Sequence, residues 1–313
     1  MMQQNKEKNF ISAVLYTYNE EKRIFKFLDK VHQVFDQYFE HFEIICVNDA
    51  STDKTVDEIK RYADTIEKGI ISILNMSFHQ GLELSMNAGI DLSIGDFVYE
   101  FDSLDSDYPI GLIKEIYDHS LKGYDIVSAV PSNGQRIYSK LFYAVFNKVS
   151  KSQSLLQTET FRILSRRGIN RVHSMSKTIP YRKAVYANCG LKTDSIRYEK
   201  ENRTSKLDRE TKRIYKETAV DALILYTDAA YRVSISFAFL MIVAALGIGV
   251  YSLGVYFAGK PVEGWTTTML FLSISFVGLF VISTILIKYL SIILRMNFNK
   301  MKYVIESVQK ING

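Results

Sequence analysis

The sequence predicts an α/β protein with a mainly parallel sheet and helices on both faces, followed by two apolar segments long enough to cross a membrane. Two patterns carry this prediction. In the first 130 residues short apolar segments alternate with helical stripes, which is typical of βαβ units. Further along, residues 233–258 and 266–288 are almost free of charge. At 313 residues and 47% hydrophobic content, the chain exceeds one average domain.

Three of the expected strands run directly into acidic or small polar residues. The segment 10–15 is followed by Asn19 and Glu20, 42–47 by Asp49, and 97–101 by Asp102. Because the carboxyl ends of parallel strands form one edge of an open sheet, we expect these side chains to converge on one crevice. That crevice is the candidate active site.

The helices between these strands are predicted from apolar stripes. Asn19 is expected to cap a first helix whose stripe runs to Tyr38, and a second helix is expected to open at Ser51-Thr52-Asp53. Asp53 is interpreted as a cap rather than a ligand. The other expected elements are strands at 70–74, 125–129 and 159–164, and helices at 81–94, 109–121, 136–148 and 211–231.

The two apolar segments predict a transmembrane hairpin. Each exceeds the roughly 20 residues needed to cross a bilayer, and only 259–265 separates them; two buried core helices are the alternative. Lys and Arg gather outside this short loop, so the positive-inside rule places the catalytic domain and both termini in the cytoplasm, at the inner (cytoplasmic) membrane. The expected domains are a cytoplasmic domain at 1–210 (halves 1–130 and 131–210), a juxtamembrane helix at 211–232, spans at 233–258 and 266–288, and a cytoplasmic tail at 289–313.

Charge and motifs exclude several classes of function. The net charge of +5 is modest and no aromatic-basic module accompanies it, so we expect a lipid surface rather than nucleic acid as the partner. The glycine-rich fingerprints of dinucleotide enzymes and of P-loop proteins are missing. Cys46 and Cys189 are expected to be reduced thiols. Carboxylates remain as the main chemical groups, and their hard oxygens suit Mg²⁺ or Mn²⁺ holding a diphosphate.

Two motifs carry a family resemblance. The segments Tyr18-Asn19-Glu20-Glu21 and Asn48-Asp49-Ala50-Ser51-Thr52-Asp53, together with the Asp-rich turn at Asp102, resemble the GT-A (Rossmann-like) family 2 glycosyltransferases. The closer resemblance is to their membrane-anchored polyprenyl-phosphate branch, the bactoprenol glucosyltransferases and dolichol-phosphate mannose synthases. It extends through Gly89-Ile90-Asp91, Phe161-Arg162-Ile163-Leu164 and the two-span hairpin, and so covers nearly the whole chain.

The resemblance implies site residues in four roles. Nucleotide-sugar binding is expected from Thr17, Tyr18, Glu20, Asp49 and His79, although His79 is equally compatible with a plain loop residue and Asp49 with a helix cap. Metal binding is expected from Asp102, Asp105 and Asp107, and catalysis from Asp102, Asp105 and Glu159. Phosphate or acceptor binding is expected from Arg136, Lys140, Arg162 and Lys206, of which Lys140 and Arg162 are equally compatible with surface charges.

Two departures from the family pattern bear on the chemistry. The family's Asp-x-Asp is Asp102-Ser103-Leu104 here, and the usual acceptor-site Asp is replaced by Thr160. A hydroxyl acceptor needs a general base, worth about 10²–10⁴-fold. A phosphate monoester, with a second pKa of about 6, is already ionised at neutral pH. The loss at Thr160 therefore harms a lipid-phosphate acceptor less, and Glu159 lies one position away.

The expected function is inverting transfer of a sugar from a nucleotide-sugar to polyprenyl (undecaprenyl) phosphate, for envelope polysaccharide or O-antigen modification. Two alternatives stay open at this point. One is transfer to a hydroxyl of a lipid-linked saccharide, and the other is a catalytically degenerate member that acts as a membrane scaffold or regulator. By resemblance alone, a homo-oligomer is also expected.

Overall fold

The computed structural model describes residues 6–133, 143–144, 147, 156–175, 181–200 and 303–312, with isolated residues between 236 and 293. The chain divides into two compact units, one made of 1–148, 152–214 and 300–313, the other of 149–151 and 215–299. The first unit holds the sheet and the candidate site. The predicted helix at 136–148 lies largely, and that at 211–231 wholly, outside the described residues.

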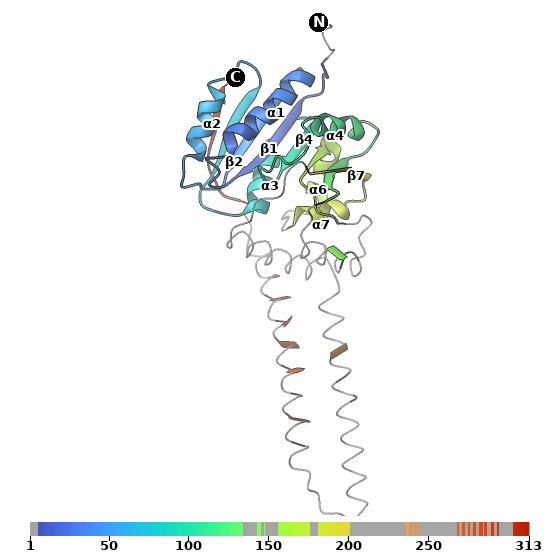
Figure 1. Ribbon diagram of the computed structural model, residues 1–313. Helices are drawn as coiled ribbons and strands as arrows, with labels where there is room; N and C mark the ends of the chain where they lie inside the picture. Colours follow the sequence, from blue (N-terminus) through green and yellow to red (C-terminus); the bar gives the residue numbers. More distant parts are fainter. Residues whose placement is uncertain are drawn as a thin grey trace, which may run out of the picture. The chain divides into compact units, whose positions relative to one another are not determined.

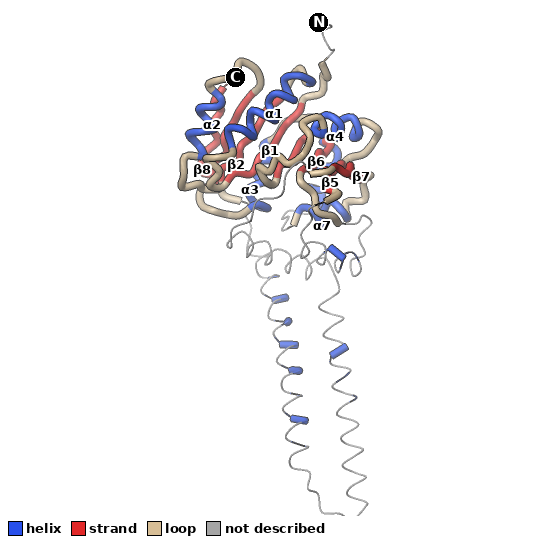
Figure 2. Tube along the Cα trace, in the orientation of Figure 1, coloured by secondary structure: helices blue, strands red, loops and turns tan. Residues whose placement is uncertain are grey.

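One mixed sheet of eight described strands forms the centre of the first unit, in the order β7-β5-β6-β4-β1-β2-β3-β8 (Figures 1 and 2). Four neighbouring strands are parallel. β1 (Ile11–Thr17) lies between β4 (Phe97–Phe101) and β2 (Phe42–Asn48), and β2 pairs in turn with β3 (Ile70–Met76). The predicted α/β fold with a mainly parallel sheet is confirmed. Strands buried on both faces are mainly apolar, and β2 is fully buried, with Glu43 and Asn48 as its polar residues.

Helices cover both faces of the sheet. On one face, α1 (Ile24–Tyr38), α2 (Thr55–Ala63) and α4 (Leu112–Ser120) bury their apolar stripes against alternate residues of β1, β2 and β4. On the other face lies α3 (Leu82–Leu92), where a Cβ at Gly89 would stand 2.4 Å from a methyl of Val14. Glycine is therefore needed for α3 to approach β1 this closely.

Three strands complete the sheet in ways that the sequence pattern did not predict. β6 (Phe161–Ser165) inserts antiparallel between β4 and β5 (Ile126–Pro131), and β7 (Thr193–Tyr198) pairs with β5 at one edge. At the other edge β8 (Ile305–Asn312) pairs antiparallel with β3. The end of the expected tail at 289–313 thus belongs to the sheet. The remaining helices, α6 (Arg166–Met175) and α7 (Arg182–Ala187), follow β6.

The register of the sheet gathers the polar residues at one edge. Thr17 pairs with Asn48 across β1 and β2, and Leu15 pairs with Phe101 across β1 and β4, so all three strands end together. Because β6 is antiparallel, its first residue Phe161 lies beside the last residue of β4, Phe101. Residues 159–160 therefore reach the same edge as the ends of β1, β2 and β4.

Among the described residues, no helix has the length and apolar character of a membrane span. Only scattered residues of the two predicted spans are described, so the hairpin stays a prediction.

Candidate active site

Asp49 is the centre of the first half of the site. Its side chain is fully buried and accepts hydrogen bonds from the backbone N–H of Gln80 (2.7 Å) and Gly81 (2.8 Å) and from the Tyr16 hydroxyl (2.9 Å). The His79 Nδ1 lies 3.0 Å from the same carboxylate. Two backbone hydrogen bonds and the contact with His79 hold the loop 79–81 against the buried carboxylate at the end of β2.

Three other predicted nucleotide-binding residues lie around Asp49. The Tyr18 and His79 rings are in contact, with centroids 4.2 Å apart and planes tilted by 33°. Thr17 is buried, and its hydroxyl donates to the Val47 carbonyl, while its own carbonyl accepts from the Asp49 N–H. The structure thus brings Thr17, Tyr18, Asp49 and His79 together; their contact with a nucleotide stays a prediction.

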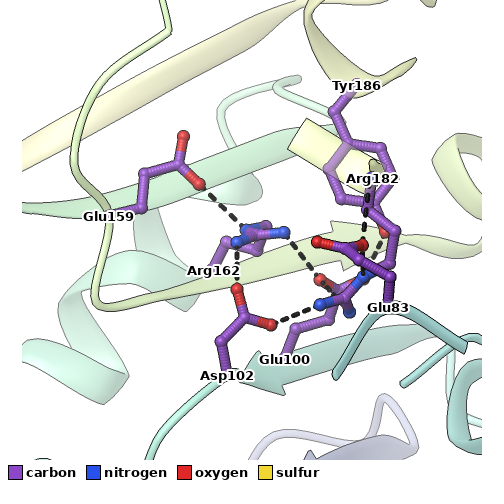
Figure 3. A network of polar contacts seen from close by, with 7 residues as sticks. All are labelled: Glu83, Glu100, Asp102, Glu159, Arg162, Arg182 and Tyr186. Atoms are coloured by element: carbon purple, nitrogen blue, oxygen red, sulfur yellow. Dashed lines mark hydrogen bonds and ion pairs between the residues drawn. The ribbon is translucent and has the colours of Figure 1, made fainter. Parts of the chain in front are cut away.

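The second half of the site is a buried charge network at the end of β4 (Figure 3). Arg162 and Arg182 are 1% and 0% exposed, and both guanidinium groups bind the same two carboxylates, Glu100 and Asp102. On Asp102, Arg162 binds Oδ2 at 2.7 Å and Arg182 binds Oδ1 at 2.5 Å. On Glu100 the distances are 2.9 and 3.1 Å. Two guanidinium groups therefore bind both Asp102, at the rim of the sheet, and Glu100, just below it.

Further acidic groups surround this pair of arginines. Glu159 lies 2.9 Å from Arg162 Nε, Glu83 lies 2.9 Å from Arg182 Nε, and the Tyr186 hydroxyl donates to Glu100 at 2.5 Å (Figure 3). Arg162 and Glu159, both predicted from the sequence, thus join Asp102 in one cluster. Thr160 pairs elsewhere, with its hydroxyl 2.5 Å from that of Tyr198.

The pKa values of Glu100 and Asp102 are shifted in opposite directions. Burial raises the pKa of Glu100 above its usual value, and this outweighs the opposing effect of Arg182 and Arg162. Burial also acts to raise the pKa of Asp102, but the positive charges of Arg162 and Arg182 have the larger effect and hold this pKa below its usual value. Asp102 is therefore ionised at neutral pH.

This pKa shift predicts how Asp102 affects stability as the pH changes. A depressed carboxyl pKa contributes stability above its unfolded value of about 3.9, and that contribution is lost as the pH falls toward the folded value. The difference in unfolding midpoint between the wild type and Asp102→Asn should be largest near pH 6 and shrink steadily below pH about 4. Thermal unfolding from pH 6 to 2.5 measures it, and a difference that is constant with pH would contradict the pairing.

The other predicted carboxylates lie apart from this network. Asp105 and Glu20 both bind Arg23, with Asp105 at 3.1 Å, and Asp107 lies 2.6 Å from Lys200 Nζ. Within the described residues, no three His, Cys, Asp or Glu side chains gather into a metal-binding group. The structure does not bring Asp102, Asp105 and Asp107 into one cluster, because each carboxylate contacts a cationic side chain of its own. Their role in metal binding stays a prediction.

Three of the predicted site residues lie outside the part of the chain that the structure describes, and three residues of the charge network were not predicted from the sequence. Arg136, Lys140 and Lys206 lie outside the described residues. Arg182, Glu83 and Tyr186 were not predicted. The sequence feature that indicates them is Glu100. This charged residue lies inside the otherwise apolar strand Phe97–Phe101, and a buried charge requires a partner.

Comparison with known proteins decides the family. The model of glycosyl transferase family 2 matches residues 12–186, more than half of the chain. The chain belongs to glycosyl transferase family 2. The match runs from β1 through α7, so it includes every described side chain of both halves of the site.

Relatives of this family 2 chain include an uncharacterized glycosyltransferase of Synechocystis sp., 30% identical over 62% of each chain. A prophage bactoprenol glucosyl transferase homolog of Escherichia coli is 27% identical over 62% of this chain and 64% of its own. An undecaprenyl-phosphate 4-deoxy-4-formamido-L-arabinose transferase of Pectobacterium carotovorum is 26% identical over 63% and 62%. The chain spans about three fifths of the length of these relatives.

A solved structure shows the same fold. A mannosyltransferase of Pyrobaculum calidifontis, in complex with GDP-Man and Mn²⁺, superposes with a TM-score of 0.53 at 14% identity, covering 94% of this chain and 89% of its own. This likeness confirms the GT-A architecture.

Proposed function

We propose that the protein transfers a sugar from a nucleotide-sugar to polyprenyl (undecaprenyl) phosphate at the cytoplasmic face of the inner membrane. The observation that carries the proposal is the family 2 domain, whose strand ends bring Asp49 and Asp102 to one edge of the sheet. Relatives named bactoprenol glucosyl transferase and undecaprenyl-phosphate transferase support the acceptor class. Arg162 and Arg182 are buried and both bind Asp102, so in the proposed site they position its carboxylate.

The residue at position 160 also favours a phosphate acceptor. Thr160 has no carboxylate to take a proton, and its hydroxyl is engaged by Tyr198. An ionised phosphate monoester needs no base. In the proposed reaction, a phosphate oxygen of the acceptor bonds to the anomeric carbon from the side opposite the leaving group. The bond from that carbon to the diphosphate breaks, and the nucleoside diphosphate leaves with the electron pair.

The sheet topology supports the proposed membrane hairpin. β7 ends at Tyr198 and β8 begins at Ile305, and both belong to one sheet. Residues 215–299, which lie between them in the sequence, belong to the second compact unit. A segment that crosses a bilayer and returns to the same domain crosses an even number of times, as a two-span hairpin does.

A divalent cation suits this site when it arrives with the diphosphate. Mg²⁺ is commonly bound through one or two carboxylates plus substrate phosphates, and Asp102 supplies one carboxylate at the rim. Such an ion would neutralise the charge that develops on the leaving diphosphate. Because both oxygens of Asp102 are engaged by arginines, the residues described do not form a protein-only cage for the metal.

This arrangement predicts that Mn²⁺ binds together with nucleotide. Calorimetric titration of Mn²⁺ into the full-length protein should give at least tenfold weaker binding alone than in the presence of UDP or GDP. Equal Mn²⁺ affinity with and without nucleotide would contradict a metal site completed by the diphosphate. Asp102→Asn, titrated in the presence of nucleotide, is the matched control and should lose most of the gain.

Transfer itself tests the proposal. The purified full-length protein is incubated with a panel of nucleotide-sugars and undecaprenyl phosphate, and the lipid products are analysed by mass spectrometry. A product whose sugar is released by mild acid has the expected sugar–phosphate bond. A sugar resistant to mild acid indicates transfer to a hydroxyl instead, and no product from any donor would overturn the proposal.

A further inference from the structure

The last described strand makes contacts beyond its pairing with β3. Past the end of β3, the Ser77 N–H donates to the carbonyl of Val304 (3.2 Å). The Gln80 side-chain amide then binds the Val304 backbone in both directions: Nε2 donates to the carbonyl (2.6 Å), and Oε1 accepts from the N–H (2.9 Å). Gln80 thus pairs with the chain as a neighbouring strand would, and its side chain is fixed at both ends.

Gln80 also contacts the first half of the candidate site, which is centred on Asp49. Its backbone N–H donates to Asp49 Oδ1 at 2.7 Å, and its neighbours His79 and Gly81 bind Oδ2. Gly81 has φ +86°, a left-handed conformation that suits glycine, so the backbone turns sharply at this point. Gln80 therefore connects Val304, just before β8, to Asp49.

A second chain of hydrogen bonds runs in parallel with the first. The Asn75 amide donates to the Ser307 hydroxyl (3.0 Å), the Asn48 amide donates to Asn75 (2.9 Å), and Asn48 accepts from the Ser51 N–H (3.1 Å). Asn48 directly precedes Asp49. In addition, the Tyr303 hydroxyl donates to Asp91 near the end of α3 (2.7 Å). Tyr303, just before β8, is therefore fixed to α3. Val304 and Ser307 are linked, through Gln80 and Asn75, to Asp49 and Asn48 at the end of β2.

We propose that β8 is a positioning element for the nucleotide pocket, and that Gln80, held by Val304, is the residue through which it acts. The inference rests on the proposed function, because it takes Asp49, Tyr18 and His79 to line that pocket. Ser77, Phe78 and His79 are exposed, so the loop that carries them has little packing of its own. A loop already fixed in its bound conformation loses less entropy when a ligand binds. Nucleotide affinity thus depends on residues that follow the predicted second span.

The test is nucleotide affinity of the full-length protein, measured by calorimetry with UDP and with GDP in the presence of MnCl₂. Gln80→Ala should raise the dissociation constant about tenfold. Ser307→Ala should shift it in the same direction by a smaller factor, and it decides the question if Gln80→Ala does not fold. Gln309→Ala, on an exposed position of the same strand, should bind as the wild type does.

A stability control separates positioning from a general weakening of the fold. Ile126→Val removes a buried methyl from β5, which four strands separate from β3 in the sheet. Affinities are compared well below the unfolding midpoints of all variants. If Ile126→Val weakens binding as much as Gln80→Ala, or if Gln80→Ala binds as the wild type does, the inference is overturned while the proposed function stands. If the wild type binds neither nucleotide, both are overturned.

Discussion

Replacing Arg182 with methionine is expected to lower the free energy of unfolding by about 3–5 kcal/mol. The side chain is fully buried and binds Glu83, Glu100 and Asp102 at once. Methionine fills a similar length but leaves these carboxylates with one cation fewer in a site shielded from water. At about 2–4 °C per kcal/mol for a domain of this size, the unfolding midpoint should fall by roughly 6–20 °C.

Two further variants make this result specific. Arg61→Ala removes an exposed arginine whose partner is Glu58, and exposed pairs contribute about 0–1 kcal/mol, so its midpoint should stay near that of the wild type. Arg182→Lys keeps the charge but has no planar fork to reach three carboxylates, so an intermediate midpoint is expected. Equal midpoints for Arg182→Met and Arg61→Ala, measured by differential scanning fluorimetry, would show that the cluster is not buried as described.

The parallel core of the fold was predictable because burial on both faces leaves a plain signal. β1, β2, β3 and β4 are apolar runs separated by amphipathic helices, and their expected positions agree with the structure to within a few residues. The start of the first helix was not predicted correctly. Asn19 has φ +55° and accepts a hydrogen bond from the Thr52 N–H, and the helix begins at Ile24 instead. Asn19, although a favourable cap residue, instead connects the loop after β1 to the loop after β2.

The order of the strands in the sheet could not be predicted from periodicity. β6 returns antiparallel between β4 and β5, and β8 joins β3 from the far end of the chain. Periodicity identifies an element but not its neighbour, because pairing depends on which edge is free when the chain returns. The segment of β8, Ile-Glu-Ser-Val-Gln-Lys-Ile-Asn, has few apolar residues, since an edge strand needs fewer of them.

The candidate site was predictable only in part, for a similar reason. The residues that end parallel strands, Asp49 and Asp102, were found because topology alone brings them to one edge. Arg182 was not found, because it lies 82 positions from Glu100 and its own segment has no distinguishing motif. The three aspartates close in sequence do not gather into one cluster, because each contacts a different cationic side chain in the fold.

The second large effect is expected in catalysis. Asp102→Asn should lower the rate of sugar transfer by about 10²–10³-fold, the range seen when one electrostatic contact to a reacting group is removed. Asparagine keeps the shape but not the charge, so it offers Arg162 and Arg182 only a neutral oxygen and gives a divalent cation a weaker ligand. The measurement is initial transfer rate to undecaprenyl phosphate at saturating donor.

Asp105→Asn and Asp107→Asn are the matched controls, because all three aspartates lie in one turn and only Asp102 contacts the two buried arginines. Asp105 is 40% exposed beside Arg23, and Asp107 is paired with Lys200. Their rates should stay within a few fold of the wild type. If Asp105→Asn or Asp107→Asn proves as damaging as Asp102→Asn, the reacting diphosphate is held further along the turn, and the arginine pair serves the fold rather than the chemistry.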